Sequence, residues 1–349
     1  MNYGRTSLRR RAKQLDARGT RIRHKIGVIL GKLLLIGIIV GGCATVSFGV
    51  GAFKGILASA PDISEVDVIP TGYSTKVLAA DGSETAKLVA AGSNRQYVTI
   101  DQIPENLQHA VVAIEDERFY DHNGIDLKGI VRALVADVRT RDFSQGASTL
   151  TQQLIKNNVL SEQWANENDS NISKMEKMER QVQRKIQEQY LAIELEKKVN
   201  DKNWILENYL NSINLGSNTL GVQAAAQRYF GKDVSKLTLS ECAVIAGITK
   251  NPAGYNPILH PKENAKRRKN VLDAMKKQGY ISQKQYDKAM ADDVYGRISE
   301  HNDVREETMN TYFVDAVIDD VFDDDFFGDS FRKQSSFGKT DIKELKDNY

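Results

Sequence analysis

Glu115 ends a segment in which apolar residues are spaced for one face of a helix. Leu107, Val111 and Ile114 mark that face, and Glu115 follows Val111 by four residues. Its carboxyl group therefore projects from the edge of the apolar face, where it is suited to act as a general base that accepts a proton from a hydroxyl. A solvated cluster of acidic residues at a helix end is the alternative, and this segment alone favours it.

A second polar segment combines a helix-capping pattern with hydrogen-bond donors. Ser148 or Thr149 is suited to cap a helix, and Thr149 with Gln152 fits a capping box. The free N–H groups of such a helix end bind phosphate well. Lys156 shares a helix face with Gln152 and Gln153, so ammonium and amide donors lie together. An ordinary capped helix with a polar face is the alternative.

A third segment places two cations beside a second carboxylate. Arg184 reaches Glu188 at the i,i+4 spacing, and Lys185 follows Arg184 directly. As an exposed pair, Arg184 and Glu188 would stabilise a helix by only about 0.2–0.5 kcal/mol. As a site, the two cations are suited to hold a diphosphate. Together the three segments supply a base, an anion site at a helix end and a cationic pair.

A mainly α-helical domain over residues 96–295 is predicted to position these groups. Helical spacing recurs along this region, and Thr238 with Glu241 forms a capping box before a buried apolar run. Strand character is confined to 61–95, where an Asp-Gly pair between two short β-prone runs predicts a hairpin.

An apolar stretch near the N-terminus predicts a membrane anchor. The 21 residues from Leu33 to Phe53 carry no charged side chain, and a helix needs about 20 such residues to cross a bilayer. We expect a basic cytoplasmic tail over 1–25, a transmembrane helix over 26–54 and a linker with the hairpin over 55–95. The basic flank places the N-terminus inside and the rest of the chain outside. A cleavable signal peptide is the alternative, but the apolar run is too long for one.

Composition excludes several classes of protein. The 349 residues are 41% hydrophobic, which rules out disorder throughout. Beyond residue 25 the chain carries 39 basic and 45 acidic side chains, so we expect no nucleic-acid partner. Two cysteines exclude a disulfide scaffold and an all-cysteine zinc site. The basic residues of the segment 263–277 are interpreted as a solvated helix face, with contact to anionic lipid as the alternative.

Five motifs in order resemble a known family. They are Glu-Asp-x-x-Phe-x-x-His-x-Gly at 115–124, Gly-x-Ser-Thr-x-Thr-Gln-Gln-x-x-Lys-Asn at 146–157, Arg-Lys-x-x-Glu at 184–188, Ile-Leu-Glu-x-Tyr-Leu-Asn at 205–211 and Leu-Ser-Glu-x-Ala at 239–243. This set resembles the family 51 peptidoglycan glycosyltransferases, the N-terminal module of class A penicillin-binding proteins. The resemblance extends from the hairpin near Tyr73 to about residue 290.

The resemblance implies a lysozyme-like α-helical lobe with a small membrane-associated lobe. Such an enzyme polymerises lipid II on the outer face of the bacterial cytoplasmic membrane, with the nascent glycan strand as donor. The new linkage is β-1,4, the anomeric carbon inverts and polyprenyl diphosphate leaves. Proteins of cell-wall elongation or division are expected partners.

The resemblance also assigns roles to residues. Glu115 is the catalytic base, and Glu188 acts near the diphosphate, where it orients groups or a divalent cation such as Mg or Mn, for which no ligand set is assigned. The expected substrate-binding residues are Asp116, Phe119, His122, Ser148, Thr149, Gln152, Gln153, Lys156, Asn157, Arg184, Lys185 and Asn211. Among them Lys156, Arg184 and Lys185 stabilise the departing diphosphate. This assignment requires Glu115 and these cations to share one cleft.

The sequence departs from the family in two places. The polar segment 158–180 is longer than is typical, and no phosphate-binding arginine is assigned in it. Class A proteins continue into a transpeptidase domain, whereas 296–349 is a polar, acidic tail that resembles the start of the linker to that domain. We therefore expect a naturally short or truncated chain, without transpeptidation.

Two other functions are considered. A lytic transglycosylase or muramidase needs a general acid for the leaving sugar oxygen and has no use for the cations that suit a diphosphate. A non-catalytic membrane-anchored scaffold would keep its cellular role after Glu115→Gln. The cations favour glycan synthesis.

Overall fold

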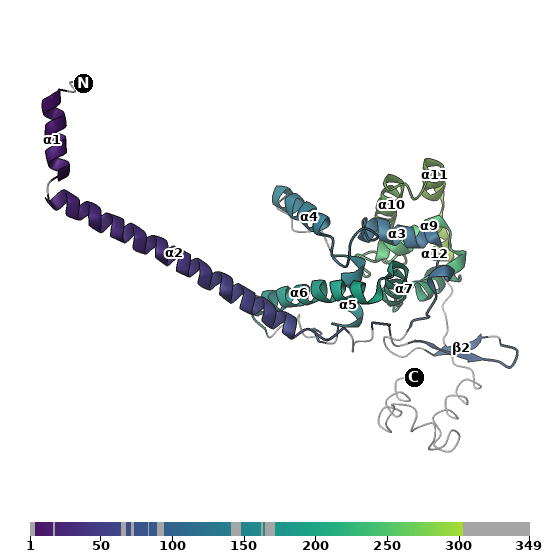
Figure 1. The fold of residues 1–349 in the computed structure, drawn as a ribbon. Helices are drawn as coiled ribbons and strands as arrows, with labels where there is room; N and C mark the ends of the chain where they lie inside the picture. The colour runs from purple at the N-terminus through teal and green to yellow at the C-terminus, as the bar shows by residue number, and fades with distance from the viewer. Residues whose placement is uncertain are drawn as a thin grey trace, which may run out of the picture. The chain divides into compact units, whose positions relative to one another are not determined.

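The computed structural model describes residues 4–16, 18–63, 68–70, 73–82, 84–88, 94–140, 148–161, 163–164 and 172–302 (Figure 1). The chain divides into two compact units, Met1–Ala60 and Pro61–Tyr349. Most of the predicted acidic tail, from residue 303 onward, and residues 162 and 165–171 of the polar segment lie outside the described residues.

The first unit consists of helices α1 (Arg5–Asp16) and α2 (Arg18–Ala58). Within α2, the most apolar part of Ile22–Ala58 has a mean hydropathy of 2.4, and none of this part is buried inside the protein. By length and composition this helix can cross a membrane. It begins inside the predicted basic tail and continues four residues beyond the predicted end of the membrane segment.

The second unit is mainly α-helical. Its helices are α3 (Glu105–Glu115), α4 (Leu127–Thr140), α5 (Leu150–Asn158), α6 (Lys174–Val199), α7 (Lys202–Ser212), α8 (Val222–Phe230), α9 (Leu239–Ile248), α10 (Pro261–Lys277), α11 (Gln283–Ala291) and α12 (Val294–Asn302), with short 3₁₀ helices η1 (Ile100–Gln102) and η3 (Val234–Lys236). Strands β1 (Thr75–Leu78) and β2 (Glu84–Leu88) pair antiparallel, with Thr75 opposite Leu88.

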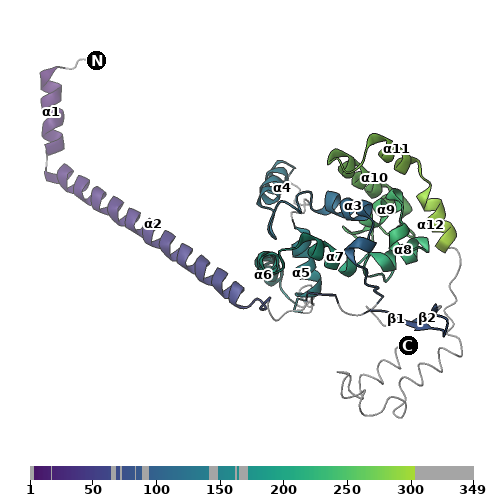
Figure 2. The same cartoon turned by 45° about the vertical axis from the view of Figure 1, so that its right-hand side comes forward.

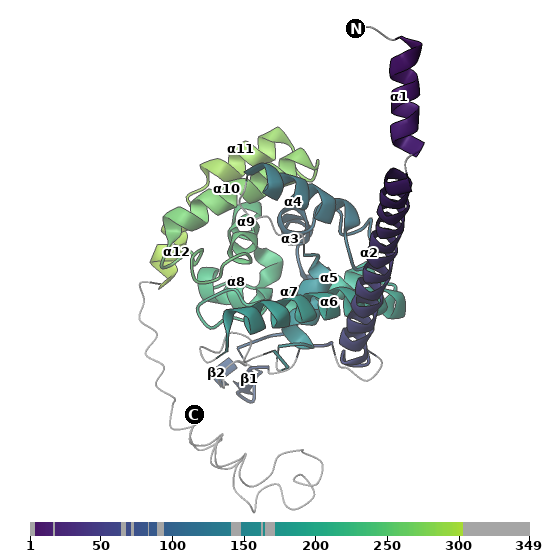
Figure 3. The ribbon, with the colours of Figure 1, turned by 90° about the vertical axis from the view of Figure 1, so that its left-hand side faces the viewer.

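Helix α9 lies in the core and packs against α3 and α10 (Figures 2 and 3). All residues from Ser240 to Ile248 are buried, as expected for a helix that is apolar on every face. The predicted capping box is confirmed, because the N–H of Glu241 donates to the Thr238 hydroxyl and the N–H of Thr238 donates to the Glu241 carboxylate. The cap fixes where α9 begins.

Helices α5, α6 and α7 form a second packed group, in which α5 contacts both α6 and α7. Leu154 and Ile155 of α5 are fully buried, as is Leu191 of α6. Gly124 lies so close to α6 that a Cβ atom there would approach the backbone of Ala192 to 2.6 Å, and its φ of +87° also favours glycine. The loop after α3 therefore packs directly on α6.

The predicted tail boundary at residue 296 falls inside α12. This helix packs against α8, and Arg228 of α8 donates to the Asn302 side chain at 2.7 Å. Val294 and Ile298 are buried, so α12 belongs to the helical body.

Candidate active site

Glu115 is the last residue of α3, and side chains from three other segments contact its carboxylate. Thr249, which follows α9, donates to Oε1 at 2.6 Å. Gln153 of α5 donates from Nε2 to Oε2 at 3.3 Å, and Nη2 of Arg267 in α10 lies 3.5 Å from Oε1. The Glu115 side chain is 13% exposed, so it is held by neighbours but still reaches a cavity.

Tyr209 fixes the orientation of the Gln153 amide. Its hydroxyl donates to Oε1 of Gln153 at 3.1 Å, which leaves the NH₂ group of that amide to face Glu115. Burial, together with the carboxylates of Glu115 and Asp116, raises the pKa of Tyr209 well above its ordinary value. The phenol therefore stays a neutral donor at physiological pH.

Glu188 of α6 is buried between the two predicted cations. Its side chain is 3% exposed, one carboxylate oxygen pairs with Arg184, and the other accepts from Nζ of Lys185 at 3.0 Å. Lys185 also donates to Ser148 Oγ at 2.6 Å and to Gln152 Oε1 at 3.0 Å. The predicted Arg184–Glu188 pair is therefore confirmed, and Glu188 orients both cations.

Most of these groups line one cavity of about 580 Å³, which we call the Glu115 cleft. Its lining residues are Ile114, Glu115, Ser148, Gln153, Lys156, Arg184, Lys185, Glu188, Thr249, Lys250 and Arg267. Glu115 thus faces the same cleft as Lys156 and Arg184, which is the geometry that the sequence-based assignment required.

The N-terminus of α5 differs from the expectation of an open phosphate site. The N–H of Leu150 donates to the Asp116 carboxylate at 3.0 Å, and the N–H of Gln152 donates to the Thr149 hydroxyl at 3.2 Å. Thr149 is the cap, as predicted, but Gln152 turns its side-chain oxygen to Lys185 and does not complete a capping box. The protein's own oxygen atoms occupy this helix end.

Several predicted substrate contacts lie inside the fold and outside the cleft lining. Nε2 of His122 lies 3.0 Å from the Asp116 carboxylate, and Phe119 is fully buried. Asn211 is also fully buried and donates to the carbonyl oxygen of Val98 at 2.8 Å. The residues placed away from the cleft lining are Asp116, Phe119, His122, Thr149, Gln152, Asn157 and Asn211. Substrate binding by these residues stays a prediction.

Sequence reasoning missed Thr249, Lys250 and Arg267. The interpretation of the 263–277 basic residues as a solvated face is wrong for two of them. The Arg267 side chain is 14% exposed and faces Glu115, and Arg268 is buried, where it donates to Ser240 Oγ at 3.0 Å. Only the packing of α10 on α3 and α9 identifies which side of the helix is inside.

Comparison with known proteins gives a family match over the region that contains this cleft. The transglycosylase family profile matches residues 81–276, more than half of the chain. Penicillin-binding protein 1A of Clostridium novyi is 36% identical over 307 residues, covering 85% of this chain and 34% of that protein. Penicillin-binding protein 1A/1B of Bacillus subtilis is 39% identical over 258 residues, covering 74% and 25%. The crystal structure of penicillin-binding protein 1A from Haemophilus influenzae matches 64% of this chain and 21% of that one, at 25% identity and a TM-score of 0.35.

The chain therefore belongs to the transglycosylase family, the peptidoglycan glycosyltransferase module of class A penicillin-binding proteins. The resemblance drawn from the five motifs is confirmed. The chain spans about a third or less of the length of the curated relatives named here.

Proposed function

We propose that the second unit polymerises lipid II into glycan strands, with Glu115 as the base. The 4-hydroxyl oxygen of the acceptor sugar forms a bond to C1 of the donor, and the bond from C1 to the diphosphate oxygen breaks. The hydroxyl proton passes to Glu115, and the electron pair leaves with the diphosphate. Because the donor is α-linked and the product β-linked, one displacement suffices. The observation that carries this proposal is the single cleft shared by Glu115, Lys156 and Arg184.

The neighbours of Glu115 support its role as base. Thr249, Gln153 and Arg267 all donate toward its carboxylate, so its position is set before substrate arrives. Such preorganised placement is a large part of enzymatic rate enhancement. Lys250 lines the same cleft and adds a further cation beside the reacting groups.

The cations opposite Glu115 suit a diphosphate leaving group. Arg184 and Lys185 are oriented by Glu188, and Lys156 has no ion-pair partner among the described residues. Charge that develops on the leaving oxygen atoms would be stabilised by these groups, and electrostatic stabilisation of this kind often contributes most to the rate enhancement of an enzyme. Lysis of a finished glycan would not use this concentration of positive charge.

A divalent cation would have to be held mainly by the substrate. Among the described residues, no group of three or more His, Cys, Asp or Glu side chains lies close enough to hold a metal. Glu188, which the family resemblance places near the diphosphate, has both oxygens engaged by Arg184 and Lys185. The protein residues therefore do not fit a resident metal, and we derive no step through one.

We further propose a lysozyme-like main lobe with a smaller membrane-associated lobe, and an outward-facing catalytic unit with the N-terminus in the cytoplasm. The apolar helix α2 and the basic residues before it support this orientation. Lipid II, the nascent glycan strand and the bilayer are the proposed partners, together with proteins of cell-wall elongation or division.

A polymerisation assay tests the proposed function. The full chain in detergent is given lipid II, and glycan strands and polyprenyl diphosphate are measured. Glu115→Gln should abolish both products. Glu117→Gln is the matched control, because Glu117 pairs with the exposed Arg132 at 3.1 Å and does not line the cleft; it should retain full activity.

Three outcomes would contradict the proposal, and a fourth concerns the metal. Polymerisation by Glu115→Gln would show that Glu115 is not the base. If Glu117→Gln lost as much activity as Glu115→Gln, the assay would be reporting protein stability. Consumption of finished peptidoglycan in place of lipid II would indicate a cleaving enzyme. Activity that disappears with a chelator and returns with Mg or Mn would assign a metal to the reaction, which the side chains alone do not indicate.

A further inference from the structure

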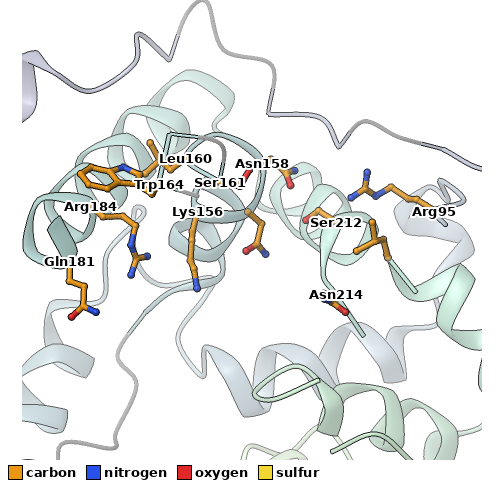
Figure 4. A pocket seen from close by; sticks show the side chains of 12 residues that line it. Arg95, Lys156, Asn158, Leu160, Ser161, Trp164, Gln181, Arg184, Ser212 and Asn214 are labelled. Atoms are coloured by element: carbon orange, nitrogen blue, oxygen red, sulfur yellow. The ribbon is translucent and has the colours of Figure 1, made fainter. Parts of the chain in front are cut away.

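A second cavity of about 540 Å³ lies beside the Glu115 cleft, and we call it the Arg95 pocket (Figure 4). Lys156 and Arg184 line both cavities. The other lining residues come from the segment before η1, the end of α5, α6 and the segment after α7: Arg95, Asn157, Asn158, Leu160, Ser161, Trp164, Gln181, Ser212, Asn214 and Leu220. The two cavities therefore share a wall that carries two cations.

Arg95 is a buried cation without an anionic partner among the described residues. Its side chain and backbone together are only 7% exposed, and its Nε is buried without a hydrogen-bond partner. Burial lowers the pKa of Arg95, and Tyr73 opposes this effect. Isolated charges are rarely buried in this way, because burial without a partner is costly. An arrangement of this kind is expected where a ligand supplies the anion.

The backbone around Arg95 is held on both sides. Its carbonyl oxygen accepts from the N–H of Ser74 at 3.0 Å, and the N–H of Leu220 donates to the preceding carbonyl, that of Asn94, at 3.0 Å. Figure 4 shows the guanidinium group extending toward Asn158 and Ser212. The side chain is therefore directed into the pocket by a fixed backbone, which preorganises it for an anion.

The lining chemistry selects an anion that carries more than one charge. None of the described residues that line the pocket is acidic, whereas Arg95, Lys156 and Arg184 contribute three cations. The Asn158 side-chain amide donates one N–H to the carbonyl oxygen of Val68 at 2.8 Å, and its second N–H can bond a further oxygen atom. The Ser212 hydroxyl already donates to the carbonyl oxygen of Tyr209 at 3.0 Å. A neutral sugar needs no such charge. Arg184 is already paired with Glu188, and a single carboxylate would leave either Arg95 or Lys156 uncompensated. Guanidinium groups match the oxygen atoms of phosphoryl groups in geometry.

We propose that the Arg95 pocket is a second diphosphate site, which takes the headgroup of the polyprenyl product after it leaves the Glu115 cleft. This inference rests on the proposed function, because that reaction supplies the diphosphate. Lys156 and Arg184 contact the diphosphate in both positions, so it moves along the shared wall without losing all of its cationic contacts. The Glu115 cleft is then free for the next diphosphate-linked sugar.

Calorimetric titration of the full chain in detergent with inorganic diphosphate tests the second site. Wild type should bind two diphosphates, one in each cavity. Arg95→Met should lose one of them, with affinity at that site at least about tenfold weaker. Arg95→Lys keeps the charge but not the forked donor, so it should bind there with intermediate affinity. Arg132→Met removes an exposed cation outside both cavities and should bind two, like wild type.

Further experiments distinguish a polyprenyl diphosphate from a bilayer headgroup as the ligand. They also test the second site separately from the proposed function. Farnesyl diphosphate should compete for the site that Arg95→Met loses, whereas phosphatidylglycerol vesicles should not; competition by the vesicles would overturn the proposal in favour of a bilayer headgroup. A single diphosphate on wild type overturns it even when Arg95→Met does not fold. Glu115→Gln should bind two diphosphates while it makes no glycan. Polymerisation by Glu115→Gln would contradict the function, and unchanged binding by Arg95→Met would contradict only the second site.

Discussion

Nη2 of Arg267 lies 3.5 Å from Oε1 of Glu115, although the two residues belong to helices far apart in the sequence. Helices α10 and α3 pack against each other and bring the pair together at the cleft wall. Both side chains are largely buried, at 14% and 13% exposed. Arg267 therefore belongs to the set of side chains that hold the Glu115 carboxylate in place.

Arg267→Gln should lower the polymerisation rate by at least about tenfold, with little change in thermal stability. The cation beside Glu115 is lost, but a polar side chain still fills the edge of the cleft. Turnover on lipid II and thermal melting measure the two effects separately. A normal rate would show that Arg267 does not influence the base.

The adjacent Arg268→Gln is the matched control, with the opposite expected result. Arg268 is buried and donates to Ser240 and to the carbonyl oxygens of Met290 and Asp292. Its loss should lower the free energy of unfolding by about 1–3 kcal/mol. Folded Arg268→Gln should keep normal turnover. A selective loss of turnover would mean that α10 presents a different face to the cleft.

Thr249→Val should reduce polymerisation about tenfold, and Thr249→Ser should restore most of it. The Thr249 hydroxyl lies 2.6 Å from Glu115 Oε1, whereas valine keeps the shape and loses the donor. Steady-state rates should change in kcat more than in KM, because the hydroxyl touches the base. Equal rates for the valine and serine variants would contradict this positioning role.

Thermal stability should fall as pH drops below the ordinary pKa of glutamate, and Glu241 should account for part of the loss. Burial alone would raise the pKa of Glu241, but the Lys232 ammonium at 2.7 Å and the Thr238 N–H outweigh it, so the pKa is lowered. A lowered folded-state pKa stabilises the fold above the unfolded-state value of about 4.5, and this is lost as pH falls through the folded-state value. Between pH 7 and 3.5 the melting temperature should fall more steeply with decreasing pH for wild type than for Glu241→Gln. The same pH dependence in both proteins would contradict this role of Glu241.

Gly124→Ala should destabilise the fold by at least about 1 kcal/mol, because an L side chain is strained at a φ of +87°. The added methyl group would also lie 2.6 Å from the carbonyl carbon and oxygen of Ala192. Denaturant unfolding measures the change. Gly82→Ala, also at positive φ but with open space around it, is the control that isolates the backbone effect from the close contact.

The chemistry-bearing groups of the cleft were largely predictable from local spacing. Glu115 at the edge of an apolar helix face and the Arg184–Glu188 pair at i,i+4 both follow from helical periodicity. The i,i+3 contact that lets Lys185 share Glu188 follows the same rule. These relations lie within one helix, so one sequence suffices to find them.

The cleft wall opposite these helices was not predictable in the same way. Arg267 and Arg268 are neighbours of the same type, yet one faces Glu115 and the other is buried against Ser240. Asp116 was predicted to bind substrate, but its carboxylate accepts from the N–H of Leu150 at the start of α5. Long-range packing decides each of these roles, and single-sequence patterns do not contain it.

The Gly124 carbonyl joins segments that each contribute to the cleft. It accepts from the Thr149 hydroxyl at 2.6 Å and from the Gln152 amide at 3.4 Å, and Gln152 in turn holds Lys185. A random-mutagenesis selection for inactive enzymes would therefore return residues at this junction as readily as residues that touch lipid II. Mutations that confer resistance to an inhibitor bound in the Glu115 cleft should, in contrast, avoid the junction, because changes there would inactivate the enzyme itself.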